Sequence, residues 1–567
     1  MADKVIITNL TTLKQKYSAD GLKAIKKAVT ALIAADKDRG FKTVLLGVDD
    51  KAAMKKLKAT AVKNSLDPKE NKVAIDGIYA ALTPDYIMIL GAIDVIPHQD
   101  LKNPLFSTEA DADDDKFAYG DLPYACEAPY SQSINDFTGP TRVVGRLPDL
   151  TGHKGSPKYL LGLLETATTW KSLTREDYEN YLGISVQKWK KSTALSLRHT
   201  FNNAVDLQTS PTKHSNWKTA LFNRRSHFIN CHGGDTMPDF FGQSEVDDDI
   251  MPTSHRASLV EKAGNILEGT VVAAECCYGG QLYDPTAADA NQMGMCNAYL
   301  ARKAYAFFGS TTTAYGPFAS NNQADLICQY FLQRVLAGSS IGRATLEARQ
   351  RFVEAKSPLS NTNQKTLAQF NLYGDPSIVP VSLPTSKVAV GSKAIPLTSS
   401  GFESVSVGLA KSKAVREVAA VERSERRQKL RAKGLMLGEL QPSFKRRVKG
   451  PSKSVQSSLY RLMRESNYKP GECISFDVTD KPSGFESLSA KSKGISKKMA
   501  AKQPQVTAFH VGFGVKSRAE NSAKKTNKKG LAKKEQLDQP GKVKNFMVLE
   551  AKEVNGKIVS ITESHSK

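Results

Sequence analysis

Short, continuous apolar runs alternate with helical stretches along the first 385 residues, and this alternation limits the possible fold most strongly. The runs are KTVLLGV, DYIMILGAIDVIP, HFINC, GTVVAAEC and KAYAFFGS, which begin at residues 42, 85, 227, 269 and 303. Runs of this kind are typical of strands that are buried on both faces of a parallel sheet. Helical periodicity lies between them, for example at residues 158–173 and 323–337. The sequence therefore predicts a doubly wound α/β sheet sandwiched by helices.

Two of these runs end on a reactive side chain that is followed by glycine. His232 and Gly233 follow HFINC, and Cys277 lies in ECCYGG, directly after GTVVAA. In a doubly wound sheet, functional groups lie just beyond the carboxyl ends of the strands. The sequence therefore predicts that His232 and Cys277 meet at one edge of the sheet.

An imidazole and a thiol in this arrangement can form a nucleophilic dyad. A cysteine attacks as its thiolate, and His232 can take the thiol proton and later protonate a leaving amine. We expect the backbone N–H groups of Gly233 and Cys277 to stabilise the oxyanion of the intermediate. Side chains alternate along a strand, so Cys276 is expected to face the opposite side from Cys277 and to be a packing residue. Either reactive residue alone would more often be structural, whereas the pair in this order favours an active site.

Several segments have a specific order along the chain. They are YIMILGAIDVIP (86–97), FAYGDLPYA (117–125), RVVGRLP (142–148), INCHGGD (229–235), AAECCYGG (273–280), FFGSTTTAYGP (307–317), IGRATLEARQRF (341–352) and FNLYGDPSIVP (370–380). In this order they resemble the gingipain family of cysteine peptidases, within the larger caspase-like group. The resemblance covers roughly residues 40–385. It implies a caspase-like fold and a cysteine endopeptidase with His232 as general base and Cys277 as nucleophile.

The resemblance also implies cleavage after Arg or Lys, because gingipains recognise that charge with a buried carboxylate. Upstream of the Gly-Arg pair, where the family has its acid, this chain has Asp136 beside Phe137. Three further residues are candidates for substrate binding or for orienting the base: Asp235, Glu275 and Tyr315. The alternatives are an exposed loop carboxylate for Asp235 and a salt bridge for Glu275.

Two acidic runs are candidate Ca²⁺ sites, because Ca²⁺ takes several carboxylate oxygens and gingipains hold this ion. The first contains Asp111, Asp113, Asp114 and Asp115, and the second contains Glu245, Asp247, Asp248 and Asp249. The alternative is that both are solvated acidic loops. The dyad itself requires no cofactor.

The basic charge is concentrated at the C-terminal end. Of the 80 Lys and Arg residues 36 lie in residues 401–567, with only 16 of the 57 Asp and Glu residues, which gives +20 of the net charge of +23. Such a segment attracts nucleic acid or an acidic protein. It can equally be an inhibitory segment or a structural addition. The alternative function is therefore a nucleic-acid- or acidic-partner-binding protein with a degenerate protease scaffold.

The expected organisation has four parts: an N-terminal α/β subdomain (1–150), a caspase-like catalytic subdomain (151–385), a linker (386–411) and a basic region with a small β domain (412–567). Seven cysteines without a CxxC motif suit a reducing compartment. The sequence shows no signal-peptide pattern and no long apolar stretch. We therefore expect a cytoplasmic, regulated endopeptidase that acts on protein or peptide substrates.

Overall fold

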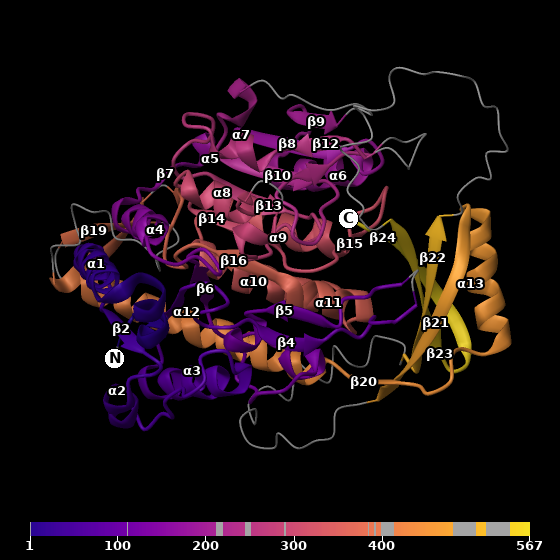
Figure 1. Ribbon diagram of the computed structural model, residues 1–567, viewed down its shortest axis with the longest axis horizontal. Helices are drawn as coiled ribbons and strands as arrows, with labels where there is room; N and C mark the ends of the chain where they lie inside the picture. The colour runs from indigo at the N-terminus through magenta and orange to yellow at the C-terminus, as the bar shows by residue number, and fades with distance from the viewer. Residues whose placement is uncertain are drawn as a thin grey trace.

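The computed structural model describes residues 2–109, 112–210, 219–243, 251–288, 291–383, 385–390, 393–398, 413–479, 506–516 and 545–567. A ten-stranded sheet lies at its centre, in the order β2-β1-β3-β6-β16-β14-β13-β10-β8-β9 (Figure 1). Its strands are β1 (Lys4–Thr8), β2 (Thr43–Gly47), β3 (Tyr86–Leu90), β6 (Val144–Leu147), β8 (Tyr181–Val186), β9 (Leu207–Ser210), β10 (Ser226–Asn230), β13 (Val271–Ala274), β14 (Ala306–Ser310) and β16 (Phe370–Tyr373). The predicted α/β class is confirmed.

The sheet consists of two parallel halves. The five strands from β2 to β16 are parallel to one another, and so are the five from β14 to β9. The halves join where β14 pairs antiparallel with β16. Strands β10 and β13 are parallel neighbours, with Ile229 opposite Ala274. The chain therefore leaves both strands at the same edge of the sheet.

Helices cover both faces of the sheet because alternate strand residues point to opposite sides. In β13, Val272 and Ala274 belong to one core cluster, and Val271 and Ala273 belong to the other. The first cluster includes α1 (Leu10–Asp38), α3 (Pro68–Leu82), α4 (Lys158–Thr169), α7 (Ala257–Glu261) and α8 (Met295–Ala301). The second includes α6 (Lys190–Phe201), α9 (Gln323–Leu336), α10 (Ile341–Ala355) and α11 (Asn361–Gln369). Among the described residues, no helix has the length and hydropathy that a membrane crossing requires.

Shorter elements connect this framework. The helices are α2 (Lys51–Lys56) and α5 (Arg175–Glu179). The strand pairs are β4 (Gln99–Lys102) with β5 (Phe117–Gly120), β7 (Leu173–Thr174) with β17 (Val381–Ser382), β11 (Phe240–Phe241) with β12 (Thr253–His255), and β18 (Thr385–Val390) with β19 (Lys393–Thr398). The hairpin of β18 and β19 begins at the last residue of the predicted catalytic subdomain and otherwise lies in the segment predicted to be a linker. The sheet is continuous across residue 150, and the predicted domain boundaries stay predictions.

A second, antiparallel sheet forms the C-terminal β region, in the order β15-β24-β23-β22-β21-β20. Its strands are β15 (Tyr315–Gly316), β20 (Ser443–Arg446), β21 (Tyr468–Thr479), β22 (Ala508–Lys516), β23 (Phe546–Val554) and β24 (Lys557–Ser566), and α13 (Lys453–Glu465) packs on it. Asn555 and Gly556 have positive φ angles of 49° and 78°, as the predicted two-residue hairpin requires. Of these strands only β15 lies before residue 440, and it pairs with β24 at one edge of the sheet (Figure 1).

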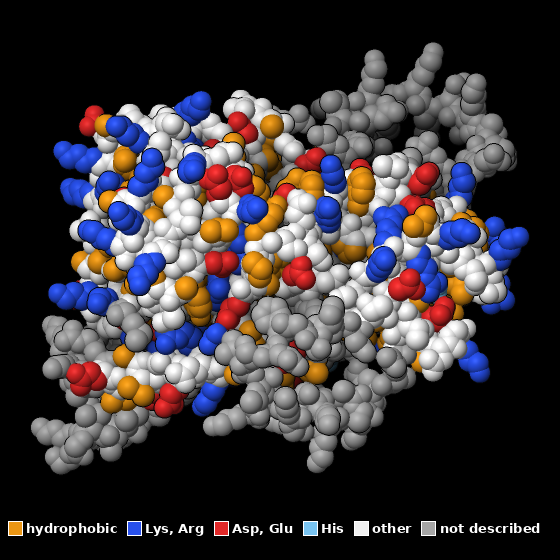
Figure 2. Space-filling model, turned by 90° about the horizontal axis from the view of Figure 1, so that it is seen from below, with side chains coloured by type: hydrophobic (Ala, Val, Ile, Leu, Met, Phe, Trp, Pro, Cys, Tyr) orange, Lys and Arg blue, Asp and Glu red, His pale blue; other side chains and the backbone are white. Residues whose placement is uncertain are grey.

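The basic helix α12 (Lys413–Leu440) packs on the body of the molecule, which is formed by residues before 385 (Figure 1). Its cations pair with carboxylates of the same chain: Arg423 with Asp3, Arg426 with Glu347, Arg427 with Asp85, Arg431 with Glu127 and Lys433 with Glu354. On the face drawn in Figure 2, Lys and Arg are spread over both ends of the molecule, with Asp and Glu among them. Much of the positive charge of α12 is therefore neutralised within the protein.

Candidate active site

His232 follows β10 and is fixed through both its backbone and its ring. Its backbone exchanges hydrogen bonds with Phe241, at 2.9 and 2.8 Å. Its buried ring lies 4.6 Å from the ring of Trp189, centroid to centroid. Nε2 donates to Oε1 of Gln243 at 2.8 Å, which leaves Nδ1 as the ring nitrogen with a lone pair. Nδ1 is buried and has no hydrogen-bond partner among the described residues.

Burial disfavours the charged form of His232. It lowers the pKa of the imidazole to about 4, and the hydrogen bond to Gln243 offsets only part of this effect. The ring is therefore neutral at physiological pH, as a proton acceptor must be.

Cys277 follows β13 and lies against the loop before β15. The Ala314 N–H donates to Sγ at 3.2 Å, and Sγ lies 3.6 Å from the Ala314 carbonyl oxygen. Gly233 packs on the backbone of Cys277, and a Cβ at Gly233 would lie 1.9 Å from the Cys277 carbonyl oxygen. Only glycine permits this close approach of the two strand ends.

Cys276 lies on the other side of the sheet. Its side chain belongs to the first core cluster together with Cys231, whereas Cys277 belongs to the second. Burial raises the pKa of the Cys276 thiol well above its usual value. A thiol in this position is a packing group.

The backbone of Lys567 bridges Cys277 and Ala314. The N–H of Cys277 donates to the Lys567 carbonyl oxygen at 3.0 Å, and the N–H of Lys567 donates to the Ala314 carbonyl oxygen at 3.0 Å. A carbonyl group is thus held at the backbone N–H of the residue that carries the thiol. This is the contact that an oxyanion hole makes.

The side chain of Lys567 enters a closed pocket that is acidic at its end. Its ammonium group forms ion pairs with Glu275 and, at 3.0 Å, with Asp325, and all three side chains are fully buried. Nζ also lies 5.5 Å from the ring centroid of Trp189. Burial alone would lower the pKa of Lys567, but Asp325 and Glu275 raise it above its usual value. The pocket is therefore built for a cation.

The two carboxyl groups of the pocket are close enough to influence each other. Burial raises the pKa of Glu275 well above its usual value, and the neighbouring Asp325 raises it further, although Lys567 opposes this. Burial and the neighbouring Asp325 therefore disfavour the charged form of Glu275, and the ion pair with Lys567 favours it.

The other predicted substrate-binding residues lie in different surroundings. Asp136 is exposed and accepts a hydrogen bond from Ser131 Oγ at 2.6 Å. Asp235 is exposed and accepts from Gln281 Nε2 at 2.7 Å. Tyr315 is buried in β15, the strand that pairs with β24, and its hydroxyl donates to Asp113. Of the predicted residues, Glu275 is the one whose side chain contacts Lys567.

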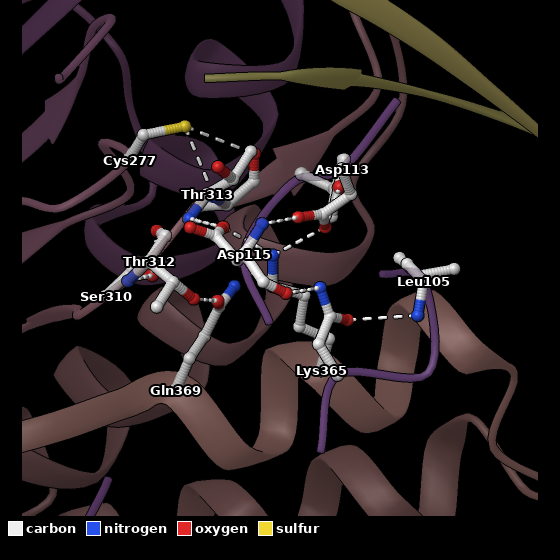
Figure 3. Close-up of polar contacts among 12 residues, drawn as sticks. Leu105, Asp113, Asp115, Cys277, Ser310, Thr312, Thr313, Lys365 and Gln369 are labelled. Carbon is white, nitrogen blue, oxygen red and sulfur yellow. Dashed lines mark hydrogen bonds and ion pairs between the residues drawn. The ribbon is translucent and has the colours of Figure 1, made fainter. Parts of the chain in front are cut away.

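The first acidic run supports the loop beside Cys277 (Figure 3). Lys365 Nζ lies 2.6 Å from Asp113 Oδ2 and 2.9 Å from Asp115 Oδ2. Asp115 also accepts from the Thr313 N–H at 2.9 Å and from the Tyr278 hydroxyl at 2.5 Å. These contacts hold the loop that presents Ala314 to the thiol.

The chemistry of this cluster suits an ammonium group better than Ca²⁺. Oxygens of Asp113, Asp114 and Asp115 lie within 4.8 Å of one another, as a metal site requires. Lys365 already supplies the positive charge between Asp113 and Asp115, so Ca²⁺ would have to displace a buried amine. The remaining predicted ligands lie outside the described residues: Asp111, Glu245, Asp247, Asp248 and Asp249.

Comparison with known families decides the class of this site. Residues 187–381 match the model of Peptidase family C25. The chain carries a gingipain-like cysteine peptidase domain. The match confirms the predicted resemblance and the predicted cysteine-type peptidase activity, and it includes His232, Cys277 and Asp325. No curated protein matches the sequence significantly.

Solved structures resemble the chain at low sequence identity. One is described as "Structure of Protease", with 13% identity, coverage of 69% of this chain and 81% of its own, and a TM-score of 0.44. The complex of Porphyromonas gingivalis RgpB pro- and mature domains has 12% identity, coverage of 68% and 82%, and a TM-score of 0.43. The Saccharomyces cerevisiae separase–securin complex has 10% identity, coverage of 42% and 14%, and a TM-score of 0.25.

Sequence reasoning missed two residues of this site. Gln243 contacts the His232 ring, and Asp325 contacts the ammonium group of Lys567. Asp325 carried a usable signal, because it is an acid in the first turn of a helix that is otherwise largely apolar and buried. Gln243 carried none, since a glutamine in a loop segment has many ordinary roles.

Proposed function

We propose that the protein is an endopeptidase that uses Cys277 and His232 as a catalytic dyad and cleaves after basic residues, with lysine preferred. The observation that carries this proposal is the position of Lys567. Its carbonyl oxygen accepts from the Cys277 N–H, and its ammonium group contacts Glu275 and Asp325. A substrate lysine in the same position would present its carbonyl group to the thiol.

The proposed reaction is acyl transfer through a thioester. His232 Nδ1 takes the Sγ proton, and the thiolate attacks the carbonyl carbon after the lysine. The Cys277 N–H stabilises the oxyanion, and the predicted second donor is the Gly233 N–H. The imidazolium group then gives its proton to the leaving amine as the C–N bond breaks. Water, activated by the same imidazole, hydrolyses the thioester and restores the thiol.

Gln243 is proposed to be a positioning residue in this reaction. Its amide oxygen accepts the Nε2 proton at 2.8 Å, which selects the tautomer whose Nδ1 can act as the base. The predicted role of Asp235 in orienting His232 has no such contact to support it, since its carboxylate accepts from Gln281 and Thr236.

A panel of fluorogenic peptides that differ only in the residue before the scissile bond tests the proposal. We expect the highest kcat/KM for lysine, a lower value for arginine, and little cleavage after alanine or aspartate. An unpaired charge in a buried site is costly, so the acidic pocket should favour a cation over a neutral side chain by about 10²-fold or more. Equal rates for lysine and alanine would refute the proposed specificity.

Gly316 allows a second test of the same pocket. A Cβ at this position would lie 2.0 Å from Cε of Lys567 and 2.6 Å from Asp325 Oδ2. Overpacking of this kind costs about 1–3 kcal/mol, so in a protein whose Lys567 is replaced by alanine, which leaves the pocket to the substrate, Gly316→Ala should lower kcat/KM for lysyl peptides by roughly 10- to 100-fold.

Gly162→Ala is the matched control, because Gly162 is exposed on α4 and a Cβ there meets nothing within 4 Å. It should leave cleavage unchanged. Steady-state kinetics of the two variants would reject the proposed pocket if Gly316→Ala did not slow the cleavage of lysyl peptides in that background.

The basic region gives less support to the alternative function. The described cations of α12 pair largely with carboxylates of the same chain, so they do not form an open binding surface there. Nucleic acid or an acidic protein as a partner of residues 401–567 stays a prediction, and so does the cellular location.

A further inference from the structure

The last residues of the chain lie in the active site in the manner of a bound peptide. Residues 565 and 566 pair antiparallel with β15, where His565 is opposite Gly316 and Ser566 is opposite Tyr315. Lys567 continues this pairing through its N–H bond to Ala314. Peptide ligands commonly bind by adding a strand to an exposed edge in this way. Here the added strand belongs to the protein itself.

Side chains as well as backbone fix this tail segment, residues 563–567. The His565 ring stacks on Phe318, with centroids 3.6 Å apart and an interplanar angle of 17°. Its Nδ1 lies 3.2 Å from the Tyr468 hydroxyl of the C-terminal sheet. Ser566 Oγ accepts from the Phe546 N–H at 3.0 Å. The tail segment is therefore held between the peptidase body and the C-terminal sheet.

The C-terminal sheet keeps the tail segment at the site. Strand β24 pairs with β23 over almost its whole length. The Tyr315 ring of β15 packs edge-on against Phe546 of β23, with centroids 5.9 Å apart. A ligand tethered in this way has an effective concentration that free peptides seldom reach.

An external substrate needs the positions that the tail segment fills. Lys567 occupies the acidic pocket and the Cys277 N–H. With it in place, Cys277 is 2% exposed and His232 is fully buried. The dyad therefore has no access to another peptide until the tail segment leaves.

We propose that residues 563–567 are an autoinhibitory segment, with Lys567 as a substrate mimic that blocks the peptidase site in cis. This inference rests on the proposed function of the same site. Release of the segment from the edge of β15 activates the enzyme, because it frees the pocket and the Cys277 N–H together. The small β domain thus holds the inhibitory strand in place.

Substitution of Lys567 tests the proposal. Lys567→Ala removes the ion pairs with Glu275 and Asp325, so the open state becomes more populated. We expect kcat/KM for an external lysyl peptide to rise by about tenfold or more, because apparent affinity scales with the fraction of accessible sites. Lys567→Met, which keeps the length of the side chain but not its charge, should act in the same direction.

Lys557→Ala is the matched control, because Lys557 is an exposed lysine at the start of the same strand. It should leave the rate unchanged. Wild-type protein that cleaves the peptide as fast as both Lys567 variants would overturn the autoinhibitory role.

Amine labelling distinguishes failure of this inference from failure of the proposed function. In Cys277→Ala, which has no thiol at the site, an N-hydroxysuccinimide ester should modify Lys557 readily and Lys567 slowly, as measured by mass spectrometry. Equal labelling of the two lysines would refute docking of the tail segment. Protection of Lys567, with no cleavage by wild type or by either Lys567 variant, would refute the peptidase proposal and autoinhibition with it.

Discussion

Cys277→Ala should reduce cleavage of lysyl peptides by about 10⁴-fold or more, since removal of a catalytic nucleophile leaves only the contribution of substrate binding and the oxyanion hole. The expected loss is in kcat, because the contacts of the substrate lysine with Glu275 and Asp325 do not involve the thiol. Fluorogenic peptide kinetics would measure it. Mass spectrometry should also show that a lysyl acyloxymethyl ketone labels the Lys567→Ala protein at Cys277 and does not label the Cys277→Ala protein.

Cys276→Ala is the matched control, because it removes the neighbouring thiol on the opposite side of the sheet. We expect activity close to that of the wild type and a loss of about 1 kcal/mol of stability from the small cavity. If Cys276→Ala were inactive while Cys277→Ala still cleaved the peptide, the nucleophile would be misassigned.

In a protein that also carries Lys567→Ala, so that the pocket is free, Asp325→Asn should lower kcat/KM for lysyl peptides by about 10²- to 10³-fold, because it removes one of the two carboxylates that face the buried ammonium group. In the same background Glu275→Gln should cost less, about tenfold, since burial raises the pKa of Glu275 well above its usual value and glutamine keeps the shape of the side chain. The double variant should lose selectivity for basic residues altogether. Measurements with lysyl and alanyl peptides would give the ratio for each protein.

Asp136→Asn provides a control for these pocket variants. The sequence analysis gave Asp136 as a candidate for the acid that recognises the substrate. In the structure its carboxylate is exposed and accepts a hydrogen bond from Ser131. We expect this substitution to leave kcat/KM unchanged. A larger loss from Asp136→Asn than from Asp325→Asn would move the specificity pocket to another part of the molecule. A larger loss from Glu275→Gln than from Asp325→Asn would show that Glu275 contributes more than Asp325 to recognition of the cation.

The proposed autoinhibitory segment binds in the same pocket that is proposed to select the substrate. The pocket that would select a substrate lysine is filled by Lys567 of the protein itself, so one interaction accounts for both recognition and restraint. A partner that separates β24 from β15 would release the dyad without any covalent change.

Much of the site could be predicted because its signals are local. A buried strand appears as a continuous apolar run, and the carboxyl ends of parallel neighbours must lie at one edge. This reasoning was sufficient to place His232 and Cys277 beyond β10 and β13, and alternation along the strand placed Cys276 on the opposite side. The hairpin at Asn555 and Gly556 was similarly local, because the turn geometry requires positive φ angles.

The acidic pocket around Lys567 could not be predicted from local sequence patterns. Glu275 and Asp325 are 50 residues apart and lie on different elements, a strand end and the first turn of α9. Their meeting depends on how α9 packs on the sheet, which no short pattern encodes. Asp113 and Asp115 looked like loop carboxylates or metal ligands, and it is the fold that brings Lys365 between them.

The sequence by itself determined the layered α/β fold, the two reactive strand ends and the concentration of basic charge after residue 400, because burial and alternation leave periodic traces along the chain. Only the tertiary structure decided where that charge goes. It pairs α12 with carboxylates of the body and brings Lys567 to Glu275, 292 residues away. Ion pairs of this kind depend on distances that folding sets, and a buried charge is stable only where the fold supplies its partner.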